Sequence, residues 1–203
     1  MKEIPMLFND KMVQSILSGR KTQTRRFVTP PPVSDNHELR LLQDGQFYWC
    51  LKNGIQHSGP VKTRYGKAGD RIWVREAFAT GLCTPDTMAY RATHKPSDLE
   101  EGWFEPIKWT PSIHMPRWAC RTLLNITSVR AERLTDISRE DALAEGMDDG
   151  SSEAAQQLGF YEKPQRAFRR LWEQIYGEVS WQNNPWVWVT TFELPDGAQY
   201  QSR

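Results

Sequence analysis

The stretch GRKTQTRR, Gly19 to Arg26, has the residue types best suited to chemistry in this chain. It sets two threonines among Arg20, Lys21, Arg25 and Arg26, although the net charge of the whole chain is only +1. Such a tract can bind phosphate, can supply a lysine base beside a hydroxyl nucleophile, or can be a solvated turn. The residues alone leave these three interpretations open.

The second interpretation has definite chemical requirements. Amide hydrolysis needs a nucleophile, a base that activates it and an acid that protonates the departing amine. The Thr24 hydroxyl is a poor nucleophile until a neighbouring base takes its proton. Lys21 can be that base only if its pKa falls by several units, and partial burial and the charges of Arg20, Arg25 and Arg26 act in that direction.

Geometry and electrostatics restrict this interpretation further. In a regular strand Lys21 and Thr24 would point to opposite faces, so catalysis requires an irregular turn at residues 20–24, which the preceding Gly19 favours. The structural alternative is that cations after a helix simply meet the negative end of its dipole, contributing up to about 1 kcal/mol.

The elements around this tract can be predicted from pattern. A short strand is expected over residues 4–8, and Asn9 or Asp10 can cap a helix that Gly19 ends. The apolar residues of that helix recur at helical spacing on one face: Met12, Val13, Ile16 and Leu17.

Further along the chain, turn and cap signals mark the remaining elements. Asn53-Gly54 predicts a hairpin, and a Gly-Asp turn at residues 69–70 precedes a strand over residues 71–78. The run RTLLNITSVRAERL, from Arg121, reads as a strand. The segment between them, residues 80–118, is expected to be loop-like.

The C-terminal third carries helix signals. Ser138 is expected to cap a short helix, with Asp141 as its capping-box partner and Gly146 past its end. Pro164 opens a longer helix, whose apolar stripe is Phe168, Leu171, Trp172 and Ile175. The run NPWVWVTTFEL closes the pattern as a strand, in which Trp186 and Trp188 share one face and are expected to pack in the interior.

Composition bounds the possible functions. The chain of 203 residues can bury one core, and its 26 basic against 25 acidic residues exclude a general DNA-coating protein. The three cysteines have no metal-ligand spacing, so neither a disulfide framework nor a metal site nor another cofactor is expected. There is no signal-peptide pattern and no segment long enough to span a membrane, so the expected localisation is cytoplasmic.

The order of elements predicts an α+β fold. Short strands outnumber helices and do not alternate with them regularly, which favours a small mixed or antiparallel β-barrel decorated by helices over a doubly wound sheet. We expect one domain over residues 1–203, with inserts at about 29–65 and 80–118.

Taken together, these motifs resemble the ASCH domain of the PUA-like superfamily, in the long form found in phage and prophage genomes. The matching blocks are residues 4–28, 66–78, 120–147 and 164–194, with GRKTQTRR, GDRIWVRE, AEGM, WTPSIHMPRWACR and NPWVWV as the motifs. The resemblance implies a small barrel whose openings are covered by helices. Relatives with this fold commonly bind RNA or modified bases.

The resemblance also implies an activity. A compact relative hydrolyses the amide of N4-acetylcytidine with a lysine, a threonine and a glutamate, which fall here on Lys21, Thr24 and Glu145. Glu145 would hold the lysine ammonium or pass a proton to the leaving nitrogen, and its structural alternative is a solvated residue in the last turn of a short helix. This chain is about twice the length of that enzyme, so the inserts could narrow the cleft to a nucleoside or extend it for a polymer.

Further residues are candidates for contact with a nucleoside or single-stranded RNA. Arg20, Arg25 and Arg26 could grip phosphates or a base edge, and Glu76 is the substitute for Glu145 if that residue lies far from the lysine. The aromatic and basic mixture of His114, Arg117 and Trp118 suits an unpaired base. The alternatives to an amidohydrolase are a non-catalytic RNA or modified-base binding module and a ribonuclease that uses the same cleft.

Overall fold

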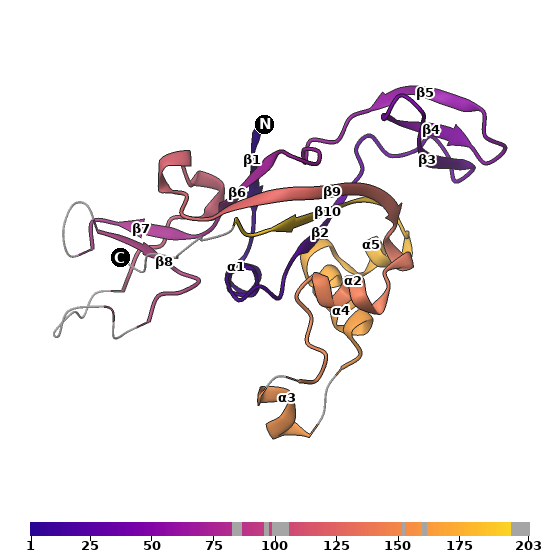
Figure 1. Ribbon diagram of the computed structural model, residues 1–203. Coiled ribbons are helices and arrows are strands. Elements are labelled where there is room, and N and C mark those ends of the chain that lie inside the picture. The colour runs from indigo at the N-terminus through magenta and orange to yellow at the C-terminus, as the bar shows by residue number, and fades with distance from the viewer. Residues whose placement is uncertain (83–86, 96–97, 99–105, 152, 160–161, 196–203) are drawn as a thin grey trace.

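A computed structural model of the chain describes residues 1–82, 87–95, 98, 106–151, 153–159 and 162–195. Its main sheet has the strand order β1-β6-β9-β10-β2 (Figure 1). These strands are β1 (Glu3–Leu7), β2 (Gln23–Phe27), β6 (Arg71–Arg75), β9 (Leu123–Arg133) and β10 (Trp186–Glu193). β1 and β6 are parallel, and the other pairs are antiparallel.

Two smaller sheets flank the main one. The first is formed by β3 (His37–Leu41), β4 (Phe47–Leu51) and β5 (Gln56–Val61), and the second by β7 (Phe78–Thr80) and β8 (Met88–Tyr90). The hairpin expected at Asn53-Gly54 is confirmed, since it joins β4 to β5. The first small sheet lies within the insert expected at 29–65, and its strand β3 was not predicted.

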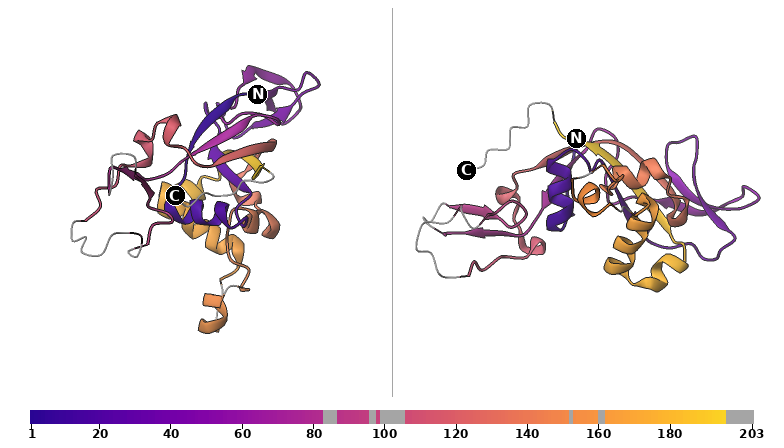
Figure 2. Two further views of the ribbon diagram at one scale, coloured as in Figure 1. Left: turned by 60° about the vertical axis from the view of Figure 1, so that its left-hand side comes forward. Right: turned by 90° about the horizontal axis from the view of Figure 1, so that it is seen from below.

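The helices lie mainly below the main sheet. They are α1 (Asp10–Leu17), α2 (Arg139–Ala144), α3 (Glu153–Leu158), α4 (Pro164–Tyr176) and α5 (Glu178–Gln182), with short 3-10 helices η2 (Ser112–His114), η3 (Arg117–Ala119) and η4 (Leu134–Asp136). Residues of α1, of α4 and of the turn after α2 line one hollow, so these elements lie close together. Two further views of the arrangement are given in Figure 2. α3 extends away from the sheet, and neither α3 nor α5 was predicted.

The mixed α+β class is therefore confirmed, whereas a closed barrel is not observed. β1 and β2 are the two edges of the main sheet, and among the described residues they do not pair with each other. A side chain spans the gap instead, because Arg26 Nη2 donates to the Leu7 carbonyl across 2.9 Å. The main sheet is thus an open sheet whose two edge strands are linked through one guanidinium.

Alternation along β10 assigns the two faces of the main sheet. Val187 and Val189 are buried in a cluster with Phe168 and Trp172 of α4. Trp188 packs on the other face, against β3, β4 and β5, and Trp186 packs beside it. The interior packing expected for Trp188 is confirmed, whereas Trp186 is only partly buried. Together they hold the β3–β5 sheet against the main one.

The apolar face of α1 fills one end of the sheet. Val13 and Ile16 are buried against Phe8 and Phe192, and Asn9 caps the helix by accepting from the Met12 N–H across 2.9 Å. Both features agree with the sequence pattern, which shows that the helix spacing and its cap were sufficient to place this element.

The stripe expected on α4 is only partly correct. Phe168 and Trp172 are buried, but Ile175 is 44% exposed. Its expected place is taken by Tyr176, whose ring lies 4.9 Å from that of Phe27. The helix begins at Pro164 as predicted.

The strand expected over residues 71–78 is broken in two. β6 ends at Arg75, and the Glu76 N–H donates to the Met115 sulfur at 3.2 Å instead of to a neighbouring strand. Part of the segment 80–118 lies outside the described residues, and its described part contains β8, η2 and η3 in addition to loops.

The turn before β6 generates a stability prediction. Gly66 has φ +84°, and a Cβ there would lie 2.4 Å from Ile4 Cδ1 and 2.7 Å from Ile126 Cδ1. We expect Gly66→Ala to lower the free energy of unfolding by about 2–5 kcal/mol, combining left-handed strain with overpacking. Urea unfolding measures this loss.

Gly69→Ala is the matched control, because Gly69 has φ +86° with nothing within 4 Å of the added Cβ. It should lose only the strain contribution of about 1–2 kcal/mol. Equal losses of unfolding free energy in the two variants would show that the side chains around Gly66 move aside at no energetic cost, which would contradict the prediction.

Candidate functional site

Lys21 is positioned by the end of α1. Gly19 has φ +72°, and the Lys21 N–H donates to the Ser15 carbonyl across 2.9 Å. Lys21 then forms an isolated bridge with Glu145 before the regular strand β2 begins at Gln23. The backbone is therefore irregular only over residues 20–22, and the irregular turn that catalysis requires at residues 20–24 does not include Thr24, which lies in the regular strand β2.

Glu145 is brought to the same place by the end of α2. Ser138 caps the helix by accepting from the Asp141 N–H at 3.0 Å, and Glu145 is its C-terminal cap residue. Gly146 follows with φ +92°, and a Cβ there would lie 3.1 Å from Ser15 Cβ and 3.2 Å from Lys21 Cβ. The absence of a side chain at this glycine thus lets the ends of α1 and α2 approach.

The two side chains form a buried ion pair. Lys21 Nζ lies 2.6 Å from Glu145 Oε2 and donates to the Glu145 carbonyl at 3.0 Å. Their side chains are 0% and 4% exposed, so the alternative of a solvated glutamate is wrong. Burial lowers the pKa of Lys21 below its ordinary value, the charge of Glu145 opposes this, and Arg26 and Arg25 lower the pKa further.

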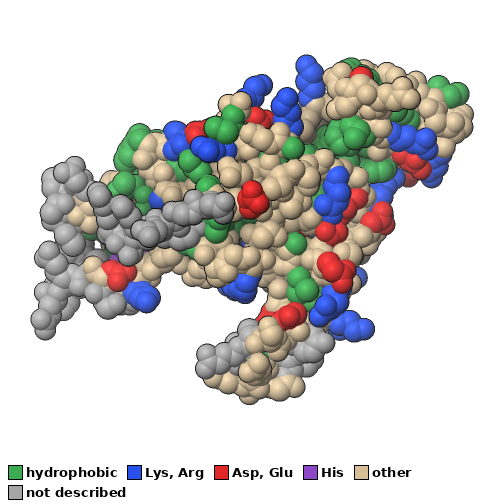
Figure 3. Space-filling view, viewed as in Figure 1, with side chains coloured by type: hydrophobic (Ala, Val, Ile, Leu, Met, Phe, Trp, Pro, Cys, Tyr) green, Lys and Arg blue, Asp and Glu red, His purple; other side chains and the backbone are tan. Residues whose placement is uncertain are grey.

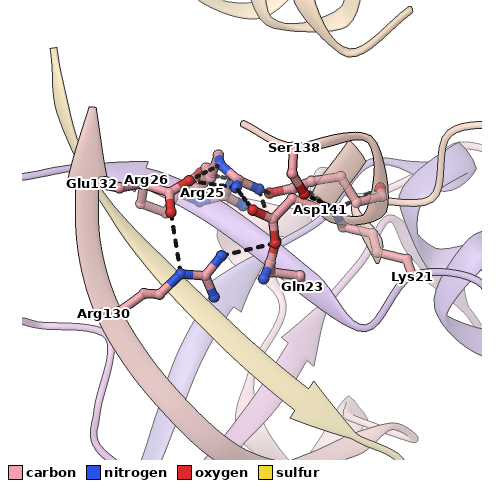
Figure 4. Close-up of polar contacts among 9 residues, drawn as sticks. Lys21, Gln23, Arg25, Arg26, Arg130, Glu132, Ser138 and Asp141 are labelled. Carbon is pink, nitrogen blue, oxygen red and sulfur yellow. Dashed lines mark hydrogen bonds and ion pairs between the residues drawn. The ribbon is translucent and has the colours of Figure 1, made fainter. Parts of the chain in front are cut away.

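Arg25 connects this pair to a larger network of charges (Figure 4). Its guanidinium lies 3.1 Å from Glu145 Oε1, 2.5 Å from Glu132 Oε1 and 3.1 Å from Asp141 Oδ2. Arg130 bridges Glu132 and Asp141 from the outer side at 3.1 and 2.8 Å. Three cations therefore face three carboxylates, and the buried charges are balanced.

Asp141 belongs to the charged network in addition to its predicted place in the first turn of α2. Its N–H is capped by Ser138 as predicted, but its carboxylate binds Arg130 and Arg25 rather than completing a capping box. Burial raises the pKa of this carboxyl, but hydrogen bonds from Arg130 and Gln23 and the charge of Arg25 outweigh burial and lower it overall. The carboxylate form is thus the one that the network stabilises.

Thr24 lies on β2, opposite Thr190 of β10. Arg25 Nη1 donates to Gln23 Oε1, which places Gln23 and Arg25 on one face of the strand, and alternation directs Thr24 to the other. The Thr24 hydroxyl is buried and has no hydrogen-bond partner among the described residues. Lys21 and Glu145 are brought together, whereas Thr24 does not contact either of them through its hydroxyl.

A cleft of about 600 Å³ opens beside the ion pair. It lies between α1, the end of α2 and α4, and its wall includes Glu145, Gly146, Arg20 and Arg170. Lys21 lies behind Glu145, without exposed side-chain surface. A ligand in the cleft would therefore meet the Glu145 backbone and carboxylate before it met the lysine.

A second hollow of about 510 Å³ adjoins this cleft. The two share Asn9 and Met12 of α1, and the second is lined also by Arg26, Trp109 and Tyr176. The Arg26 side chain thus borders the second hollow, and the same side chain links the edge strands β2 and β1 through its hydrogen bond to the Leu7 carbonyl.

The remaining predicted site residues lie elsewhere. Glu76 is 0% exposed and forms a paired contact with Arg121, at 2.9 and 2.8 Å, outside the two hollows. His114, Arg117 and Trp118 are exposed on η2 and η3, and none of them lines either hollow. Arg117 instead pairs with Glu3 at 2.7 Å, and Trp118 is 70% exposed.

The network also contains residues that the sequence did not single out. Glu132 and Arg130 come from β9, where the run RAER places these two charges at alternate positions, on one face of the strand. That alternation is the signal that could have indicated a buried charged face, although it does not name the partner. Among the described residues, no group of three or more His, Cys, Asp or Glu could hold a metal ion. In the same part of the chain, no helix has both the length and the apolar character needed to cross a membrane.

The buried pair can be tested by a double-mutant cycle. Glu145→Leu leaves the Lys21 ammonium buried without its carboxylate, so we expect a loss of about 3–5 kcal/mol in the free energy of unfolding. Lys21→Met should cost less, because Arg25 still binds Glu145. The double variant should lose about 0.5–3 kcal/mol less than the sum of the two.

Glu3→Leu and Arg117→Met form the control cycle. This ion pair has side chains 38% and 45% exposed, so solvent screens it and the two substitutions should be additive. Additivity in the Lys21 and Glu145 cycle would contradict the buried contact.

The chain was compared with known protein families, with curated proteins and with solved structures. No family model matches it, and no curated protein or solved structure matches it either. Its function is therefore inferred from its own residues and from the motifs described above.

Proposed function

We propose that this protein is an amidohydrolase that acts on an N-acylated pyrimidine nucleoside such as N4-acetylcytidine, with Lys21, Thr24 and Glu145 as its catalytic residues. The observation that carries the proposal is the buried contact between Lys21 Nζ and Glu145 Oε2 at 2.6 Å beside a cleft. These two residues are far apart in sequence, and they are two of the three that the resemblance to the ASCH domain implies.

The chemistry divides into two steps. In the first, Thr24 Oγ attacks the acyl carbon while its proton passes to the neutral Lys21 amine, and the bond from carbon to nitrogen then breaks. The departing amine takes the proton back from Lys21, either directly or by way of Glu145. In the second, water hydrolyses the threonine ester and releases the carboxylic acid.

Two observations support these roles. The lowered pKa of Lys21 increases the fraction of neutral amine, which is the form that can accept a proton. The Thr24 hydroxyl has no competing hydrogen bond among the described residues. Because Lys21 binds Glu145 here and Thr24 lies on the other face of β2, the proton transfer requires Lys21 to release Glu145 and the backbone at residues 22–24 to turn the Thr24 hydroxyl toward the amine.

A binding-only function is the second candidate, and one observation favours it. The Lys21 side chain has no exposed surface, so a ligand could occupy the cleft through Arg20, Glu145 and Gly146 without reaching the amine. In that case the network serves only to hold α1, α2 and β2 together, and the protein recognises a modified base or RNA without changing it.

Hydrolysis of N4-acetylcytidine by purified protein separates the two candidates. We expect Lys21→Ala and Thr24→Val each to reduce kcat/KM by at least about 100-fold, because a nucleophile or its base is removed. Thr122→Val is the matched control, since the Thr122 hydroxyl is also buried without a partner, and it should stay within about twofold. Binding of the nucleoside without turnover by the wild type would establish the binding-only function instead.

The pH dependence of the reaction reports on Lys21 directly. Since the neutral amine is the active form, kcat/KM should rise with pH through the lowered pKa of Lys21 and level off above it. The Glu145 carboxylate raises that pKa, so Glu145→Gln should move the rising limb to lower pH.

If Lys21 were not the base, Glu145→Gln would lower the rate without moving the limb. The pH profile of Thr122→Val serves as the reference, because this variant leaves every charged group in place. Thermal unfolding of each variant at the assay pH confirms that the protein compared is folded.

A further inference from the structure

A third hollow lies on the opposite side of the main sheet from α4, between that sheet and the β3–β5 sheet. It has a volume of about 920 Å³, within the range of ligand sites, and shares no lining residue with the cleft at Glu145. Its walls come from β1, the ends of β3, β4 and β5, the turn before β6, and β9. We call it the basic groove.

Charge is the first feature of the basic groove. Four cations line it, namely Lys2, Lys62, Arg64 and Lys67, and all four are exposed. Within the described part of the chain, none of them forms an ion pair. The lining holds one carboxylate, that of Asp70, which is buried and accepts from the backbone N–H groups of Lys2 and Lys67.

The surrounding carboxylates do not neutralise these cations. Glu3, next to Lys2, binds Arg117 at 2.7 Å, and Asp44 accepts from the Tyr48 hydroxyl at 2.5 Å. Four cations therefore stand against two nearby carboxylates, Asp70 in the lining and Asp44 beside it, so the groove keeps a net positive charge that attracts an anionic ligand.

The second feature is an apolar wall. Ile4, Leu41, Phe47, Val61 and Val129 line the same groove. Phe47 is only partly buried, with the edge-to-face packing of its ring on Trp188 at 4.8 Å holding it in place, and Leu41 is 60% exposed. Hydrophobic side chains gather at the foot of the β3–β5 sheet, with basic side chains along the neighbouring upper edge (Figure 3).

We propose that the basic groove binds single-stranded nucleic acid, with Lys2, Lys62, Arg64 and Lys67 on the phosphates and Phe47 and Leu41 against the bases. Regularly spaced anions joined to flat apolar rings match a groove that has cations and an apolar wall together. An acidic peptide would use the cations but leave the apolar wall without a partner, and a lipid surface would not enter a hollow between two sheets. The proposal does not depend on hydrolysis at Lys21.

The test is fluorescence anisotropy with a labelled oligouridylate of about twelve nucleotides, a length within the site sizes of single-strand binding grooves. We expect binding that weakens steeply between about 50 and 200 mM salt. The variant Lys62→Glu/Lys67→Glu should bind at least about tenfold more weakly. Its log–log salt slope should be shallower by roughly 0.7 for each phosphate that no longer has a cation partner.

The matched control is Lys108→Glu/Lys163→Glu, which changes the net charge equally at two exposed lysines outside the groove. It should bind within about twofold of the wild type at the same salt. An equal loss in both double variants would show a general charge effect and would overturn the site, as would the absence of binding by the wild type.

Two further probes define the ligand class. An abasic strand with the same number of phosphates should bind at least about fivefold more weakly, because it lacks the rings that contact the apolar wall. Equal affinity for the abasic strand or for polyglutamate would overturn the nucleic-acid proposal in favour of a simple polyanion site. The corresponding oligothymidylate tells RNA from DNA, and binding of either strand supports the proposal.

The outcome is independent of the proposed hydrolase. Lys62→Glu/Lys67→Glu should leave the hydrolysis of the free nucleoside unchanged, because neither residue lines the cleft at Glu145. Conversely, Lys21→Ala should leave oligonucleotide binding unchanged. Failure of the hydrolase proposal would therefore be seen in nucleoside hydrolysis, and failure of the nucleic-acid proposal would be seen in oligonucleotide binding.

Discussion

The structure depends on one buried junction, at which Lys21, Arg25 and Glu145 meet with almost no solvent contact. Charges removed from water are costly unless each is paired and hydrogen-bonded, so every element that meets there is constrained at once. α1 must end before Gly19, α2 must end with Glu145 as its cap residue, and β2 must start beside both ends. The glycine at 146 is part of the same constraint, because a side chain there would push α1 and α2 apart.

The two faces of the main sheet contact different elements, because successive side chains of each strand point to opposite faces. On β10 the valines contact α4 and the tryptophans contact the β3–β5 sheet. On β2 the same alternation sends Arg25 toward the charged network and Thr24 to the other face. A strand at the sheet edge can thus serve an ion network on one side and a linkage between edge strands, through Arg26, on the other.

Local features of the sequence were sufficient to predict much of this fold. The cap at Asn9, the end of α1 at Gly19, the Asn53-Gly54 hairpin, the Ser138 cap and the start of α4 at Pro164 all depend on neighbouring residues. Such signals act over a few positions, which is why pattern can identify them.

What could not be predicted depends on contacts between distant residues. The break after β6 occurs where the Glu76 N–H donates to the Met115 sulfur, and the exposure of Ile175 occurs because Tyr176 packs on Phe27. For the site, the contact of Lys21 with Glu145 was implied only by family resemblance, and the contributions of Glu132 and Arg130 from β9 were missed. Exposure of His114 and Trp118 on η2 and η3 likewise follows from tertiary packing, in which Met115 and Ala119 take the buried positions.

The net charge of +1 conceals an uneven distribution of charge. Inside the protein, cations and carboxylates are matched, since Lys21, Arg25 and Arg130 face Glu132, Asp141 and Glu145. In the basic groove, four cations stand together without such partners in the described part of the chain. Like charges held close together repel each other and reduce the stability of the folded state. The imbalance is best explained by a ligand that supplies the missing negative charge.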